Sequence, residues 1–285
     1  MKFAFDLAAN RSLTKREYFA LKDRGFNLLP IEKSHPGSHL CRFLLFKNPT
    51  QISSSVQTQR QYLEFCEVLD VDSAKSYFES INANQDEHFS SVFYLSCNAG
   101  LSTFFHSRKN QFSNFGINFL HKNYDWKVNS EDYLPGWNFI YFKKNLVNGI
   151  QCSLAEYEHS LESNAPDASY TIHPNSVFKI MGVIWTIESE EQLQPLCQLI
   201  SKQVSTGEIE LDDGTKIWIT TKLSTKIDHV FTKKTSFSAV VLACKSFDTC
   251  LSYFGNGDII TFLNKRAILI KHPEEMWDIV ITESL

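Results

Sequence analysis

One carboxylate stands inside an otherwise apolar, strand-like run of this chain. Glu64 lies within the segment Tyr62–Phe65, and the run continues to Val68. A carboxylate in such a strand is partly desolvated, which can raise its pKa toward that of a useful general base. Its oxygen atoms could also bind a divalent metal ion. The plain alternative is an inward carboxylate that only makes structural hydrogen bonds, and the sequence leaves these three roles open.

Three basic side chains lie shortly before this carboxylate. His35 and His39 flank a Pro-Gly-Ser turn, and Arg42 follows in the next apolar run. If the turn folds over a binding site, we expect His39 to assist Glu64 in catalysis and His35 to contact the substrate. Arg42 could bind an anionic group of the substrate, although an Arg at a strand edge is often structural. An exposed turn is the alternative for both histidines.

Two further residues are candidates for contact with a ligand. Cys66 lies two residues after Glu64, so on a strand it shares the face of the carboxylate. Trp137 belongs to a group of aromatic residues between 126 and 141 that predicts an apolar wall, part of which could line a binding cavity. For both residues, ordinary core packing is the alternative.

The composition predicts a globular protein and excludes several classes. The 285 residues are 43% hydrophobic with a formal net charge of −4, which argues against a general nucleic-acid binder. No apolar run reaches the length of a membrane span, and the N-terminus lacks the apolar stretch of a secretory signal. The seven cysteines are odd in number and include no CxxC pair. We therefore expect reduced cysteines in a cytoplasmic protein without a membrane or nucleic-acid partner.

A repeated order of elements organises the chain. Four times a strand-like run is followed by a helix-like run and then by further strands, starting near Phe3, Val92, Gly182 and Phe237. This order is βαβββ. The segment 148–176 has little apolar periodicity and is rich in Ser, Asn, Pro and Asp near its end, as linkers are. The sequence therefore predicts an N-terminal pair of modules over residues 1–165 and a C-terminal pair over 176–285.

Four local motifs occur in an order that is typical of one family. They are Gly25-Phe26 with Pro30, which matches "GF-x-x-x-P"; Ser34–His39, similar to "HPGGGTHN"; Tyr62–Phe65, similar to "YLEL"; and His173-Pro174-Asn175, similar to "HPNG". With the four modules, this order resembles the glyoxalase-like branch of the vicinal oxygen chelate superfamily, which also contains the bleomycin resistance proteins and extradiol dioxygenases. The motifs cover about residues 10–185.

The resemblance implies an α+β fold in which paired βαβββ modules form cup-shaped mixed sheets, with four modules in two pairs. In metal-dependent members, the first and last strands of paired modules supply His and Glu ligands. Glu64 stands where the last-strand Glu of the family falls, so it is a tentative metal ligand, but the first strand has Asp6 and no His. The C-terminal pair offers Asp278 alone. The usual ligand set is therefore incomplete, and no cofactor is predicted beyond a divalent metal ion as an option.

Two functions follow from the resemblance. In the first, a small organic molecule is held in the N-terminal cup by a lyase or isomerase that removes a proton beside a carbonyl, with Glu64 as base or metal ligand. In the second, a metal-free protein of the same fold binds or sequesters the small molecule. The lack of a first-strand His favours the second function, whereas the retained Glu64 and the His-containing turn favour the first. The resemblance also leaves a homodimer open.

Overall fold

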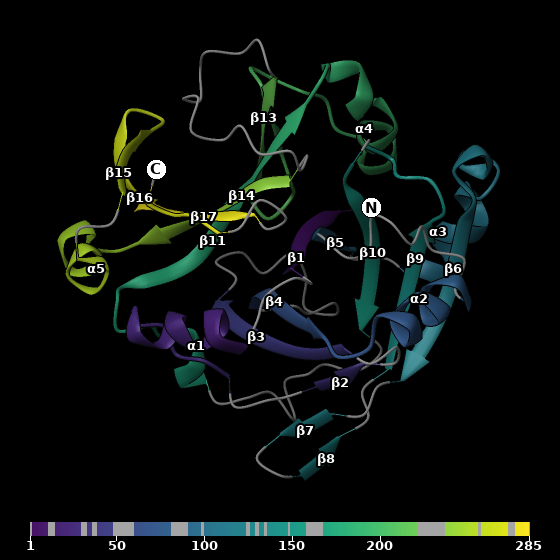
Figure 1. Cartoon of the computed structure of the whole chain (residues 1–285). Coiled ribbons are helices and arrows are strands. Elements are labelled where there is room, and N and C mark those ends of the chain that lie inside the picture. Colours follow the sequence, from purple (N-terminus) through teal and green to yellow (C-terminus); the bar gives the residue numbers. More distant parts are fainter. Residues whose placement is uncertain are drawn as a thin grey trace.

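Two mixed β-sheets with flanking helices form the computed structural model of this chain (Figure 1). The structure describes residues 2–10, 15–29, 33–35, 39–47, 60–80, 91–97, 100–123, 126–128, 131–133, 136–147, 149–157, 168–221, 237–255, 258–272 and 277–284. The order of strands in the first sheet is β6-β9-β10-β5-β1-β4-β3-β2-β7-β8. In the second sheet it is β12-β13-β11-β14-β17-β16-β15.

The first module has the predicted βαβββ order. Its elements are β1 (Phe3–Asn10), α1 (Lys15–Asp23), β2 (Lys33–His35), β3 (His39–Lys47) and β4 (Arg60–Val68). Strand β4 returns parallel to β1. The turn that follows helix α1 contains Gly25. Its φ of 75° is a left-handed conformation that favours a residue without a Cβ. The N–H groups of Gly25 and Phe26 donate to the carbonyls of Lys22 and Leu21, which is a Schellman motif.

The second module repeats this order around an inserted hairpin. It consists of β5 (Ser91–Cys97), α3 (Leu101–Arg108), β6 (Ile117–Asn123), β9 (Gly136–Phe142) and β10 (Gln151–Tyr157), with β7 (Trp126–Val128) and β8 (Glu131–Tyr133) inserted after β6. Strands β1 and β5 pair antiparallel at the centre of the sheet. Strand β10 lies inside the segment 148–176, where the sequence shows little apolar periodicity, and within the predicted N-terminal pair of modules at residues 1–165.

The N-terminal sheet is strongly curved. Strand β7 follows β6 directly in the chain, and β6 is one edge of the sheet, yet β7 pairs with β2 on the opposite side. Helix α2 (Val71–Ser80) packs its buried Ala74 against Val68 of β4 and Leu120 of β6, although four strands separate β4 from β6. Both contacts require a curved sheet, and this is the cup that the resemblance implied.

The C-terminal sheet has the same central topology. Its elements are β11 (Val177–Ile187), η4 (Glu190–Leu193), α4 (Gln194–Ile200), β12 (Glu208–Glu210), β13 (Lys216–Thr221), β14 (Phe237–Cys244), α5 (Phe247–Phe254), β15 (Asp258–Phe262), β16 (Lys265–Ile270) and β17 (Asp278–Glu283). Strands β11 and β14 pair antiparallel, and β13 and β17 flank them in parallel. The third module has two strands after its helix among the described residues, whereas the fourth has three.

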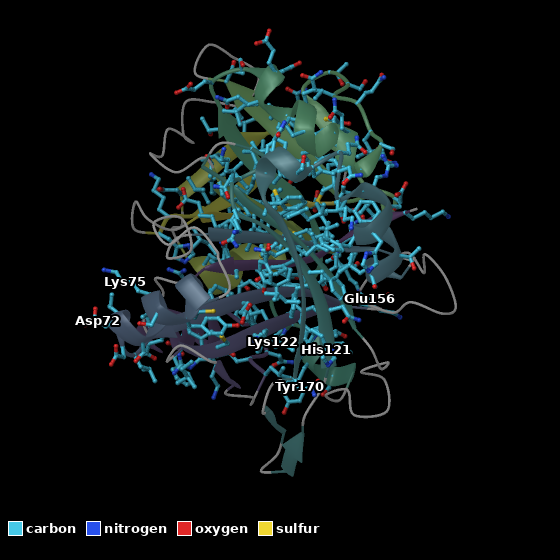
Figure 2. All side chains as sticks on the ribbon, turned by 90° about the vertical axis from the view of Figure 1, so that its right-hand side faces the viewer. Asp72, Lys75, His121, Lys122, Glu156 and Tyr170 are labelled. Carbon is cyan, nitrogen blue, oxygen red and sulfur yellow. The ribbon has the colours of Figure 1, made fainter. Side chains whose placement is uncertain are left out.

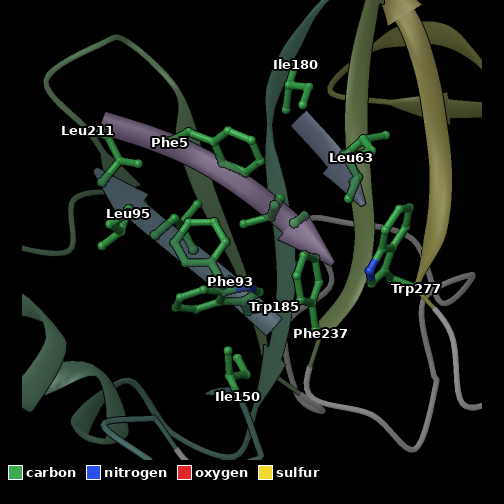
Figure 3. Packing of buried hydrophobic residues seen from close by; sticks show 14 of the residues in the cluster. Phe5, Leu63, Phe93, Leu95, Ile150, Ile180, Trp185, Leu211, Phe237 and Trp277 are labelled. Carbon is green, nitrogen blue, oxygen red and sulfur yellow. The ribbon is translucent and has the colours of Figure 1, made fainter. Parts of the chain in front are cut away.

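One hydrophobic core joins the two sheets. It contains side chains from one face of each sheet and from all four module helices. Phe93 of β5 meets Trp185 of β11 edge-on at 5.1 Å (Figure 3). Phe65 of β4 packs against Trp277 at 5.7 Å. Because alternate residues of a strand point to opposite faces, each sheet keeps a second face away from this shared core.

Hydrogen bonds also cross between the sheets. Strand β1 pairs with β4 only from Leu7 onward, so its first N–H groups need other acceptors. The N–H of Phe3 donates to Asp212 Oδ2 at 2.7 Å, and that of Phe5 donates to Asp213 Oδ2 at 3.1 Å. Gln61 of β4 donates to Thr215 Oγ1 and accepts from the N–H of Ile180. The turn between β12 and β13 thus docks on the N-terminal sheet.

Candidate site in the N-terminal cup

The second face of the N-terminal sheet is lined by aromatic and aliphatic side chains. This face, called the cup face below, includes Leu7, Phe43, Tyr62, Tyr94, Trp137 and Phe139, all of them buried. Helix α2 lies over it through the contacts of Ala74, and its Asp72 and Lys75 point away from the molecule (Figure 2). Tyr170 of η3 (Ala168–Thr171) packs against the same face.

Glu64 lies on the cup face, as the alternation of β4 predicts. In the sheet it lies between Ala9 of β1 and Phe43 of β3, and Tyr62 and Cys66 share its face. The side chain is partly buried. None of the described residues donates a hydrogen bond to its carboxylate or forms an ion pair with it. The structural role that the sequence left open, a carboxylate occupied by internal hydrogen bonds, is therefore not seen in the described part of the chain.

Two thiols adjoin this carboxylate. Cys41 of β3 is directly opposite Cys66 of β4, and their Sγ atoms lie 3.2 Å apart. One oxygen of Glu64 and both Sγ atoms lie within 4.8 Å of one another. Cys66 was expected beside Glu64, but Cys41 was not, because its position follows only from the register of β3 against β4.

Two polar groups on the other half of the cup face have no hydrogen-bond partner among the described residues. Ser153 and Gln151 of β10 alternate with the core residues Cys152 and Leu154, so they point to the same face as Ala155. Both are buried, and neither Ser153 Oγ nor Gln151 Oε1 has a hydrogen-bond partner among the described residues. Sequence reasoning missed them together with β10. Native proteins leave few buried polar groups unpaired, so these atoms indicate where a bound molecule could pair.

The other predicted site residues are placed as follows. Trp137 of β9 is buried on the cup face, with Glu64. Arg42 points to the opposite face: its register partner Phe65 belongs to the shared core, its Nη1 donates to Glu67 Oε2 at 3.1 Å, and its guanidinium lies over the Tyr18 ring. The structure does not bring Arg42 and Glu64 together.

The histidines of the turn are described only through their backbone. His35 ends β2 and pairs with His39, which begins β3 two residues before Cys41. Their side chains and the turn at residues 36–38 lie outside the described part of the structure. The backbone therefore places both residues on strands of the N-terminal cup.

The second face of the C-terminal sheet has a different character. It is lined by apolar residues including Met181, Trp218 and Phe262. Asp278, which the resemblance placed at a Glu-like position, is buried and accepts a hydrogen bond from the N–H of His272 at 2.8 Å. The contrast with Glu64 marks the N-terminal cup as the better candidate.

Comparisons with known proteins agree with this geometry. No protein-family model matches the sequence, and no curated protein sequence matches it. Homoprotocatechuate 2,3-dioxygenase from Arthrobacter globiformis matches over 100% of this chain and 80% of its own, with a TM-score of 0.52 and 9% identity.

The chain has the vicinal oxygen chelate fold.

Catechol 2,3-dioxygenase matches with a TM-score of 0.48 and 7% identity, over 99% of this chain and 87% of its own. The 2,3-dioxygenase LapB from Pseudomonas sp. KL28 matches with a TM-score of 0.46 and 7% identity, over 99% and 92%. The predicted α+β fold of paired βαβββ modules is confirmed by the strand order of the two sheets and by the match to homoprotocatechuate 2,3-dioxygenase. No helix in the described residues is both long enough and apolar enough to cross a membrane.

The metal ligands that the vicinal oxygen chelate fold implies do not fit this chain. Those ligands come from the first and last strands of the modules, and the β1 residue beside Glu64 is Ala9, which has no ligand atom. In the second module, the first strand is β5 and the last is β10. There Tyr94 of β5 lies beside Ser153 of β10, and neither residue is a His or Glu. A His and Glu set is therefore not assembled by the described residues of β1, β4, β5 and β10.

Proposed function

We propose that this protein binds a small aromatic molecule with hydroxyl groups on the cup face of its N-terminal sheet, with Glu64 as the anchor. The observation that carries the proposal is the Glu64 carboxylate itself, which lies on an aromatic face without a hydrogen-bond donor among the described residues. A hydrogen bond to a carboxylate stabilises a complex by about 1.5–3 kcal/mol. A ligand hydroxyl would supply the donor that the protein does not.

The surroundings of Glu64 support an aromatic ligand. Phe43 lies beside Glu64, and Tyr94, Phe139 and Trp137 form the wall of the same cup. Aromatic rings stack or meet edge-on with a preference worth about 0.5–1.5 kcal/mol beyond their buried area. Ser153 and Gln151 could pair with a second polar group of the ligand. The dioxygenase with the same fold is named for homoprotocatechuate, a small organic molecule, which agrees with a small ligand in this cup.

Proton transfer is the chemistry that Glu64 could perform if the aromatic ligand also carries a carbonyl group with a neighbouring C–H. A carboxylate on an apolar face can remove a proton from a carbon beside a carbonyl, as a lyase or isomerase requires. His39, two residues before Cys41 on β3, is the proposed assistant in this step, and His35 on β2 a proposed substrate contact. Because Ala9 replaces a first-strand ligand, a metal-free binding protein is the second candidate. A cytoplasmic location and a homodimer stay predictions.

Ligand-observed nuclear magnetic resonance tests the proposal. Saturation transfer from the protein is measured to catechol, phenol and cyclohexanol in separate samples. We expect transfer to catechol, weaker transfer to phenol and none to cyclohexanol, because only the first two can use the aromatic wall. Equal transfer to all three compounds, or none to any, would contradict the proposal.

Solvent deuterium exchange separates an enzyme from a binding protein. 4-Hydroxyphenylacetone, a phenol that also has acidic C–H groups beside a carbonyl, is incubated with the protein in heavy water. Incorporation of deuterium that is lost in Glu64→Gln supports the enzyme, whereas binding of catechol without any exchange supports the binding protein.

A further inference from the structure

We infer that Cys41, Cys66 and Glu64 form a binding site for a thiophilic divalent metal ion such as Zn²⁺. The three side chains come from two paired strands, and their ligand atoms lie within 4.8 Å of one another. The inference does not depend on the proposed organic ligand, because it concerns the protein and the metal ion alone.

The distances suit a tetrahedral ion. Two sulfur ligands at the usual Zn–S distance of about 2.3 Å lie about 3.8 Å apart in a tetrahedral site. The Sγ atoms of Cys41 and Cys66 are 3.2 Å apart, so a separation larger by about 0.6 Å is enough to admit the ion. Cys41 and Cys66 are register partners on β3 and β4, so both thiols point to the same face of the sheet. Small rotations of the two side chains can therefore increase the distance between the Sγ atoms.

The donor set determines the class of metal. Thiolates favour Zn²⁺ and other thiophilic ions, whereas Mg²⁺ and Ca²⁺ require oxygen ligands. Each thiol releases its proton to solvent when the metal ion binds. The two thiolates and the Glu64 carboxylate then carry three negative charges, which exceed the two positive charges of the ion. Three protein ligands leave one tetrahedral position open for water or for another ligand, as in catalytic rather than structural zinc sites.

The burial of this cluster favours a site over simple packing. Cys41 and Cys66 are only 1% and 3% exposed, and a buried thiol alone behaves as a small apolar residue. Glu64 is different, because a carboxylate near the protein interior is costly unless it is paired. A cation between the three groups provides that pair, whereas apolar packing leaves the carboxylate without one among the described residues.

Cobalt spectroscopy on the full-length, reduced protein tests the site. Co²⁺ is added to protein that has been freed of metal by a chelator. We expect one equivalent to bind with a thiolate-to-cobalt charge-transfer band in the near ultraviolet and the intense visible bands of a tetrahedral ion, and Zn²⁺ to displace it. Cys41→Ser and Cys66→Ser should each weaken Zn²⁺ binding at least about 100-fold, since even indirect partners of a metal ligand contribute 10–100-fold.

Matched variants make the result specific. Cys197→Ser changes a partly exposed cysteine of α4 and should leave the cobalt spectrum unchanged. Glu64→Gln should keep the thiolate band but weaken binding. If the cysteine variants do not fold, alkylation of the wild-type protein in mild urea, where the buried thiols can react, gives the same answer: Zn²⁺ should slow the reaction of Cys41 and Cys66 but not that of the partly exposed Cys197. Folded, reduced protein that gives no thiolate band, or equal alkylation with and without Zn²⁺, would overturn the inference.

Discussion

Ala9 and Glu64 lie side by side on the parallel strands β1 and β4, on the cup face of the N-terminal sheet. In the metal-dependent proteins that the sequence resembles, the first and last strands both provide ligands. Here, of these two neighbouring positions, only the one on the last strand carries a side chain that could bind a metal ion. Glu64 therefore has no metal-binding side chain beside it on β1. Cys41 and Cys66 are the nearby groups that could bind a metal ion together with its carboxylate.

Ser153 should show opposite effects on stability and on binding. Its Oγ is buried and has no partner among the described residues, and an unpaired buried polar group costs about 1–3 kcal/mol. Ser153→Ala should therefore leave the free energy of unfolding unchanged or raise it by about 1 kcal/mol, while catechol binding weakens. Urea unfolding and calorimetric titration measure the two effects.

Thr186→Val is the control for Ser153→Ala. Thr186 Oγ1 lies 2.6 Å from Ser238 Oγ and 3.0 Å from Thr220 Oγ1, so its hydroxyl is fully paired. Its removal should lower the free energy of unfolding by about 1 kcal/mol. A loss of stability in Ser153→Ala as large as in Thr186→Val would contradict the interpretation of Ser153 as an unpaired group.

His173 should make folding sensitive to acid. Its Nδ1 accepts from the N–H of Asn27 at 3.1 Å, and Nε2 lies 3.0 Å from Leu45 O, so the neutral ring is bound on both sides. Burial lowers its pKa from 6.5 to about 4. The unfolded chain therefore takes up the proton first, and stability falls as the pH drops from 6.5 toward 4. This difference corresponds to roughly 3 kcal/mol.

His173→Gln removes the titrating group and should remove this part of the pH dependence. Urea unfolding of both proteins over the same pH range checks the prediction. The account of His173 fails if the variant keeps the full loss of stability between pH 6.5 and 4.

Gly182 should tolerate no side chain. It pairs with Lys216 across β11 and β13, and a Cβ at this position would lie 1.9 Å from the Lys216 carbonyl oxygen. Because the obstacle is backbone, Gly182→Ala should cost at least about 3 kcal/mol. The control Gly100→Ala, whose nearest neighbour is Thr103 Oγ1 at 3.7 Å, should cost less than about 1 kcal/mol. Equal unfolding midpoints for the two variants would contradict the close approach.

The two sheets should unfold together. Their shared core includes Phe93 and Trp185, and Gln61 bonds across to Thr215 and Ile180. Differential scanning calorimetry should show one transition whose calorimetric and van't Hoff enthalpies agree. Two separate transitions would instead show that the two predicted module pairs, residues 1–165 and 176–285, are independent folding units.

The module order could be predicted from the sequence because it depends on local signals. Gly25 follows α1 with a left-handed backbone, as a glycine at the end of a helix indicates, and the run around Glu64 forms β4. Strand β10 was missed because the side chains of Gln151, Ser153 and Glu156 interrupt a short run without a bulky β-branched residue. That strand completes the second module only through pairing with β5 and β9.

The candidate site depends on register, which the sequence does not contain. Alternation alone shows that Arg42 and Cys41 point to opposite faces, but not which of them points into the cup. The pairing of β3 with β4 decides it, by placing Arg42 opposite Phe65 and Cys41 opposite Cys66. Glu64 and Trp137 reach the same face from different modules only because the sheet is continuous from β4 to β9.

Titration of catechol into wild-type protein and Glu64→Gln by isothermal calorimetry tests the central claim most directly. The glutamine keeps the size of the side chain but removes the charge that accepts a ligand hydrogen bond. We expect binding to weaken by at least about tenfold, corresponding to the lower limit of a charge-assisted hydrogen bond. Equal affinity of the two proteins for catechol would show that Glu64 does not anchor the ligand.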